Sequence, residues 1–200
     1  MTLLELIIAG FGGQGILFLG EILTRAAILE GRQATWMPSY GPEQRGGTAT
    51  CTVVIADEPI GSPVVADPDA VIVMNRPSMD KFEPRVRPGG VLVVHSSMVD
   101  RPARRSDITV VAVDAAAEAR ALGQPQVANI VLLGALLAVR PVVAIESVAQ
   151  ALAGHFPADR RHLVEVNVSA LRRGEAAAIR PAAAPGRAAR GLGSVGEGGR

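Results

Sequence analysis

Short apolar runs alternate along the chain with longer segments in which apolar residues recur every three or four positions. The short runs lie at residues 3–9, 34–37, 70–74, 91–95 and 108–113, and segment 48–56 alternates apolar and polar residues. Both patterns are typical of β-strands. Helical spacing predicts a helix that begins at residue 16, and further helices over 78–86, 114–122, 127–139, 145–156 and 160–173.

Strands that alternate with helices indicate an α/β fold with three layers, α/β/α, around a mostly parallel, Rossmann-like sheet. Segment 48–56 follows its neighbour without a helical crossover, so we expect one antiparallel strand. The predicted domain occupies residues 1–173. From Gly174 onward the composition narrows to Ala, Gly, Arg and Pro, which predicts a low-complexity, disordered tail over 174–200.

Composition excludes several classes of protein. A formal net charge of +1 gives no field that would attract nucleic acid or a membrane surface. The longest apolar run, 130–139, is shorter than the roughly 20 residues of a membrane span, and residues 1–6 lack the basic start of a signal peptide. We therefore expect a cytoplasmic protein with no nucleic-acid partner, no membrane span and no metal site.

The most distinctive segment is a glycine loop that contains Gly10, Gly12, Gly13, Gln14 and Gly15. It follows the first strand and opens the first helix, which is the context of the dinucleotide-binding fingerprint. A helix N-terminus offers unpaired N–H groups to a phosphate or carboxylate. Alternatively, the glycines let helix and strand pack closely, or they contact a partner chain. The residues alone leave both interpretations open.

The fingerprint also requires an acidic residue at the end of the second strand, where it binds a ribose hydroxyl. Here that strand ends Trp36-Met37-Pro38-Ser39-Tyr40, without Asp or Glu. An independent NAD(P)-dependent oxidoreductase is therefore only the alternative hypothesis. A phosphate- or nucleotide-sensing module without an enzymatic role is a third.

A second loop, PSYGPEQRGG at 38–47, follows a strand end, where open α/β sheets place their ligands. Arg45, between flexible glycines, would form a bidentate clamp on a carboxylate or phosphate. Alternatively, it is a structural loop in which Arg45 pairs with Glu43 or with another subunit. The candidate binding or interface residues of this loop are Ser39, Tyr40, Gly41, Glu43, Arg45, Gly46 and Gly47.

Several isolated polar residues are further candidates. Asn75 ends an apolar strand and Asn129 lies in a helix that is apolar nearly all round, so both need buried partners or line a cleft. Cys51, within an apolar strand, is expected to be an inert core thiol. His95 is followed by two serines, but strand neighbours point to opposite faces and no G-x-S-x-G elbow is present, so a hydrolase is not favoured.

Taken together, these segments resemble the gamma subunit of 2-oxoacid:ferredoxin oxidoreductases, the family that acts on pyruvate, 2-oxoglutarate and ketoisovalerate. The resemblance covers about residues 1–170 and also includes Gly20 and Cys51. The matching segments are GFGGQGI at 10–16, PSYGPEQRGG at 38–47, SPVVADPDAVIVMN at 62–75, PGGVLVV at 88–94 and ANIVLLGAL at 128–136.

The resemblance implies a non-autonomous subunit of a complex that converts a 2-oxoacid to acyl-CoA and CO2 and reduces ferredoxin or another acceptor. Such a complex carries thiamine diphosphate with Mg2+ and [4Fe–4S] clusters, and coenzyme A is a substrate. This chain has no Gly-Asp-Gly segment and a single cysteine. We therefore expect no catalytic residue and no bound cofactor in the chain alone, which should be inactive.

The resemblance further implies that the missing groups belong to thiamine-binding alpha and beta subunits and to a ferredoxin-like subunit or domain. The two glycine-rich loops would then lie near alpha or beta chains and near the coenzyme A region. Under this interpretation, the chain is a subunit that contributes to the shape of the complex.

Overall fold

The computed structural model describes residues 3–40 and 48–179, which build one six-stranded sheet with the order β2-β3-β1-β4-β5-β6. Strands β1, β4, β5 and β6 are parallel, whereas β3 is antiparallel to both of its neighbours, β1 and β2. The predicted mostly parallel α/β sheet with one antiparallel strand is confirmed. The strands are β1 (Leu3–Phe11), β2 (Gln33–Tyr40), β3 (Thr48–Ala56), β4 (Ala70–Val73), β5 (Val91–His95) and β6 (Thr109–Val113).

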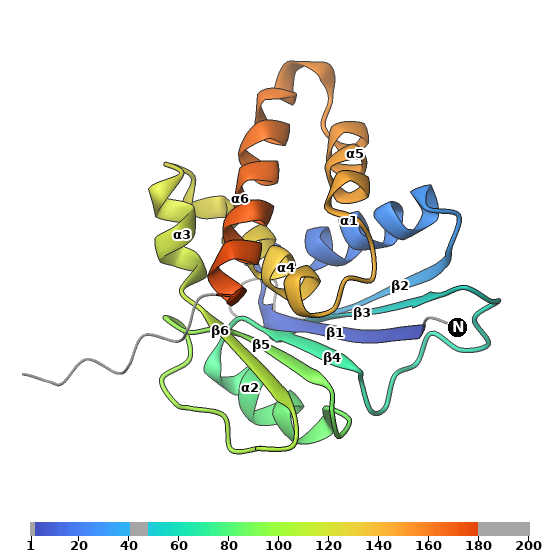
Figure 1. Ribbon diagram of the computed structural model, residues 1–200, viewed down its shortest axis with the longest axis vertical. Helices are drawn as coiled ribbons and strands as arrows, with labels where there is room; N and C mark the ends of the chain where they lie inside the picture. Colours follow the sequence, from blue (N-terminus) through green and yellow to red (C-terminus); the bar gives the residue numbers. More distant parts are fainter. Residues whose placement is uncertain (1–2, 41–47, 180–200) are drawn as a thin grey trace, which may run out of the picture.

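Helices cover the two faces of the sheet unequally (Figure 1). One face carries α1 (Ile16–Leu29), α3 (Ala115–Ala121), α4 (Ala128–Val139), α5 (Ile145–His155) and α6 (His162–Ile179), and the other carries only α2 (Arg76–Phe82). Three short 3-10 turns, Glu83–Arg85, Pro125–Val127 and Ala158–Arg160, complete the helical segments. Within the described ranges, no helix is long and apolar enough to cross a membrane.

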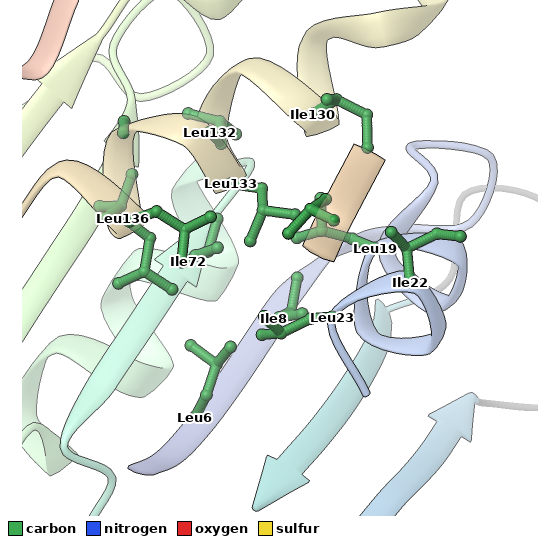
Figure 2. Close-up of a cluster of buried hydrophobic side chains, with 14 of the residues drawn as sticks. Leu6, Ile8, Leu19, Ile22, Leu23, Ile72, Ile130, Leu132, Leu133 and Leu136 are labelled. Atoms are coloured by element: carbon green, nitrogen blue, oxygen red, sulfur yellow. The ribbon is translucent and has the colours of Figure 1, made fainter. Parts of the chain in front are cut away.

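The alternation of side chains along β1 divides the apolar interior into two cores. Leu6 and Ile8 are fully buried on the side of α1 and α4, whereas Ile7 and Ala9 belong to a smaller core under α2. Figure 2 shows Leu6 and Ile8 facing leucines and isoleucines of α1 and α4. Each fully buried side chain of this size contributes about 1.5–3 kcal/mol relative to exposure, so the larger core dominates the stability of the fold.

Helix α6 crosses α4 at a pair of glycines, Gly134 and Gly174, which we call the helix crossing. A Cβ atom at Gly134 would overlap the carbonyl oxygen of Leu171, and one at Gly174 would overlap the carbonyl oxygen of Val131. The prediction that the last helix stops at Arg173 is therefore wrong, because Gly174 is a buried contact inside α6. Residues 180–200 lie outside the described residues, and their disorder stays a prediction.

Candidate functional site

Strand register brings the two glycine-rich segments to one edge of the sheet. At the end of β1, Phe11 pairs with Thr48, and Gly10 pairs with Ala49, which in turn pairs with Tyr40 of β2. Residues 41–47, which we call the hairpin loop, therefore connect two strand ends at the edge of the sheet that also carries the glycine loop, and Thr48, the residue after them, pairs directly with Phe11. We call this end of the sheet, where the parallel strands finish, the carboxyl edge.

Most candidates from the second motif fall in the hairpin loop. Gly41, Glu43, Arg45, Gly46 and Gly47 lie outside the described residues, so the proposed clamp on an anion stays a prediction. Ser39, the neighbour of that loop, is exposed near the end of β2.

The glycine loop turns the chain sharply between β1 and α1. The amide of Gln14 donates to the carbonyl of Phe11 at 3.2 Å, which closes a turn around Gly12 and Gly13. Gly13 has a φ of 93° and Gly15 a φ of 75°, a left-handed conformation that favours glycine. Gly15 is the N-cap of α1 and provides no side-chain acceptor for the helix. Backbone geometry therefore accounts for these two glycines without a ligand.

The side-chain amide of Gln14 lies between the ends of β1 and β4. Its Oε1 accepts a hydrogen bond from the amide of Phe11 at 2.7 Å, and its Nε2 donates to the carbonyl of Met74 at 3.2 Å. Since α1 and α2 lie on opposite faces, this is the switch point where open α/β sheets bind ligands. At this point a side chain of the protein itself connects the two strand ends.

One buried asparagine contacts Gln14 and a second contacts the adjacent Gly15; we call Gln14, Asn75 and Asn129 together the amide cluster. Asn75 is 2% exposed, donates to Oε1 of Gln14 at 3.5 Å, and accepts from the amide of Ser78, which caps α2. Asn129 is 5% exposed and donates from α4 to the carbonyl of Gly15 at 3.1 Å. The prediction that both asparagines are buried is confirmed, and these hydrogen bonds favour a structural role over a cleft lining.

The order of the strands also argues against dinucleotide binding. In the dinucleotide-binding fold the second strand lies beside the first, so that its terminal acid reaches the ribose. Here β3 lies between β1 and β2, which moves the end of β2 one strand further away. The NAD(P) alternative is not supported, because the acid is missing, the end of β2 is displaced by one strand, and Gln14 connects the ends of β1 and β4.

A polar chain of His95, Ser97 and Asp114 lies further along the carboxyl edge; the sequence drew attention to His95 and the serines after it, but not to Asp114. The hydroxyl of Ser97 lies 3.3 Å from Nδ1 of His95 and hydrogen-bonds to the carboxylate of Asp114. Because the serine lies between the acid and the imidazole, it donates to the carboxylate and is not activated as a nucleophile. Asp114 is detectable in the sequence only as the N-cap of α3, where it accepts from the amide of Ala117.

Burial controls the ionisation of two groups near this edge. It lowers the pKa of His95, which is 6% exposed, below its ordinary value, although the nearby carboxylate of Asp114 acts in the opposite direction. It raises the pKa of Cys51 to about 12, against a smaller lowering effect of a hydrogen bond with Trp36. Cys51 is thus a protonated core thiol at neutral pH, as the sequence predicted, and it contacts α1 at Gly20.

These features define a class: a Rossmann-like α/β domain whose glycine loop is closed by its own amides. Among the residues that the structure describes, no group of three or more His, Cys, Asp and Glu side chains could hold a metal ion. The hydrogen bonds described at the carboxyl edge cap α2 and α3 and connect β1, β4 and α4.

The chain belongs to the pyruvate ferredoxin/flavodoxin oxidoreductase family, whose profile matches residues 5–177. It is 39% identical over 168 residues to ketoisovalerate oxidoreductase subunit VorA of Methanothermobacter thermautotrophicus, covering 84% of this chain and 35% of that one. It is 38% identical over 156 residues to 2-oxoglutarate synthase subunit KorC of Methanocaldococcus jannaschii, covering 76% of this chain and 83% of the relative.

A solved structure agrees with these relatives. The gamma subunit of a keto/oxoacid ferredoxin oxidoreductase from Geobacter sulfurreducens PCA superposes with a TM-score of 0.78 at 32% identity, covering 89% of this chain and 97% of that chain. The chain spans about a third of the length of VorA and most of the length of KorC. The resemblance to gamma subunits is confirmed, and the relatives are subunits of 2-oxoacid:ferredoxin oxidoreductases.

Proposed function

We propose that this chain is the gamma subunit of a thiamine diphosphate-dependent 2-oxoacid:ferredoxin oxidoreductase and that it shapes the complex without taking part in bond-making. The observation that supports this proposal is the pair of hydrogen bonds by which Gln14 joins the ends of β1 and β4, in a chain whose relatives are subunits of such enzymes. The complete enzyme would oxidise a 2-oxoacid to acyl-CoA and CO2 and pass electrons to ferredoxin or another acceptor.

The residues of this chain do not fit the redox and thiamine cofactors. A [4Fe–4S] cluster needs about four thiolates, whereas the chain has one cysteine, which is buried and protonated. The sequence has no Gly-Asp-Gly segment for Mg2+ and thiamine diphosphate. In the proposal these groups belong to the alpha and beta subunits and to a ferredoxin-like subunit or domain, so the isolated chain is inactive.

The carboxyl edge is the proposed contact region for those partners and for coenzyme A. The amide cluster is neutral, and each of its members already hydrogen-bonds within the chain. Arg45 is the one Lys or Arg within the two glycine-rich motifs, so it is the proposed partner of a coenzyme A phosphate or of a carboxylate on another subunit. The proposed location of the complex is the cytoplasm.

Reconstitution tests this function. The chain is expressed alone and together with candidate alpha, beta and ferredoxin-like subunits, and reduction of ferredoxin is followed with pyruvate, 2-oxoglutarate or ketoisovalerate and coenzyme A. We expect turnover only from the complete set, and co-purification of the chain with the thiamine-binding subunits. Decarboxylation by the isolated chain, or its failure to co-purify with those subunits, would contradict the proposal.

A further inference from the structure

Gln14 makes hydrogen bonds to two strands that are not neighbours in sequence. Its Oε1 accepts from the amide of Phe11 at the end of β1, while the amide of Gln14 itself donates back to the carbonyl of Phe11. Its Nε2 reaches the carbonyl of Met74, just after β4. One side chain therefore closes the glycine loop and connects it to the strand that leads into α2.

Only a side chain with an acceptor and a donor on the same terminal group makes these contacts together, which a primary amide provides. Space for it depends on Gly10, where a Cβ atom would lie 2.5 Å from Oε1 of Gln14 and 3.0 Å from Cβ of Met74. The glycine at position 10 is therefore explained by the side chain at position 14. Asn75 adds a weaker contact at 3.5 Å from the α2 side.

We propose that Gln14 is a positioning residue, which holds the glycine loop against the ends of β1 and β4 and so fixes the surface that partner subunits contact. This inference rests on the proposed function, since it assigns the carboxyl edge to subunit assembly. Phe11 pairs with Thr48, the first residue of β3 after the hairpin loop. A fixed position of Phe11 in the glycine loop therefore also fixes the start of β3. Gln14 acts through the backbone that it orders.

Two substitutions separate the contacts. Gln14→Met keeps a side chain of similar length but removes both hydrogen bonds, whereas Gln14→Glu keeps the acceptor for Phe11 and, when ionised, loses the donor to Met74. Gln150→Met is the matched control, because Gln150 is exposed on α5 and lines a groove with α1. All variants are full-length chains.

The first readout is amide hydrogen exchange of the isolated chain. We expect Gln14→Met to lower the protection of Phe11 about fivefold to tenfold, which is the size of one lost hydrogen bond. Gln14→Glu should keep that protection, and β5 should keep its protection in every variant. A fall in protection spread evenly over the sheet, or none at Phe11 in Gln14→Met, would overturn the positioning role.

The second readout is titration of the chain into its partner subunits. We expect both Gln14 variants to raise the concentration for half-maximal turnover about fivefold to tenfold, while turnover at saturating chain stays within about twofold. Equal half-maximal concentrations for wild type and variants would overturn the inference but leave the proposed function intact. A wild-type chain that never stimulates turnover would instead overturn the proposed function, and with it the assignment of Gln14 to assembly.

Discussion

The glycine loop and the helix crossing use glycine for different physical reasons. In the loop, Gly13 and Gly15 adopt left-handed φ values of 93° and 75°. At the crossing, Gly134 and Gly174 lie inside regular helices, and the missing Cβ lets the two backbones touch. The first pattern resembled a ligand site, and Gly174 of the second resembled a helix stop; in the structure the loop glycines provide left-handed backbone and the crossing glycines allow a close approach of two helices. Glycine spacing alone does not distinguish a binding loop from a close approach.

The largest expected effect is at the helix crossing. Gly174→Ala places a methyl group on the carbonyl oxygen of Val131, and because backbone cannot rotate away, we expect a loss of about 2–4 kcal/mol in the free energy of unfolding. Urea denaturation measures it. The control is Gly154→Ala on α5, which has nothing within 4 Å of the new Cβ and should be neutral or slightly stabilising. A loss of less than about 0.5 kcal/mol in the free energy of unfolding of Gly174→Ala would contradict the steric overlap expected between α6 and α4.

Within the loop, Gly15→Ala should cost more than Gly13→Ala. Both substitutions force a left-handed residue, at about 1–2 kcal/mol, but only position 15 also overlaps the side-chain amide of Asn129. We expect the difference between the two variants, measured by urea denaturation, to be about 1 kcal/mol. Equal losses would mean that the contact with Asn129 adds nothing to the requirement for glycine.

Two buried asparagines differ in whether they donate to another element or within their own helix. Asn129 donates across elements, from α4 to Gly15, whereas Asn167 donates to Leu163 within its own helix, α6. Asn129→Ala should therefore cost about 1–2 kcal/mol and Asn167→Ala less, because only the first leaves a distant carbonyl without this donor. Thermal unfolding of the two variants checks the ranking. The reverse order would contradict the role given to the amide cluster.

The smallest effect is a pH dependence near the carboxyl edge. Burial keeps the pKa of His95 below the value of the unfolded chain, so below about pH 6.5 the unfolded state binds a proton that the folded state does not. Stability is full above that pH and falls as pH decreases. Between about pH 7.5 and 5.5, His95→Gln should lose less stability than wild type. If the free energy of unfolding changed with pH by the same slope in His95→Gln and in wild type, the role given to His95 would be refuted.

The fold was largely predictable because its strands and helices carry strong periodic patterns. The expected strand over 91–95 matches β5 (Val91–His95), and the lack of a crossover before β3 correctly indicated one antiparallel strand. The end of α6 was not predictable, because Gly174 reads as a helix stop unless the position of α4 is known.

The site was only partly predictable. Sequence singled out Gln14, Asn75 and Asn129, but their hydrogen bonds depend on which strand ends become neighbours in space. The insertion of β3 between β1 and β2 pairs the start of β3 with the end of β1, and it also moves the end of β2 away from the place where a dinucleotide-binding fold needs its acidic residue. No local pattern encodes that order of strands.

The side chain of Gln14 closes the glycine loop, and we expect the loop to bind no dinucleotide. Calorimetric titration of the full-length chain with NADH and NADPH tests it directly. We expect no heat of binding to the chain for either cofactor up to about millimolar concentration, where typical dinucleotide sites are saturated. Micromolar binding that is abolished by Gly12→Val would contradict it.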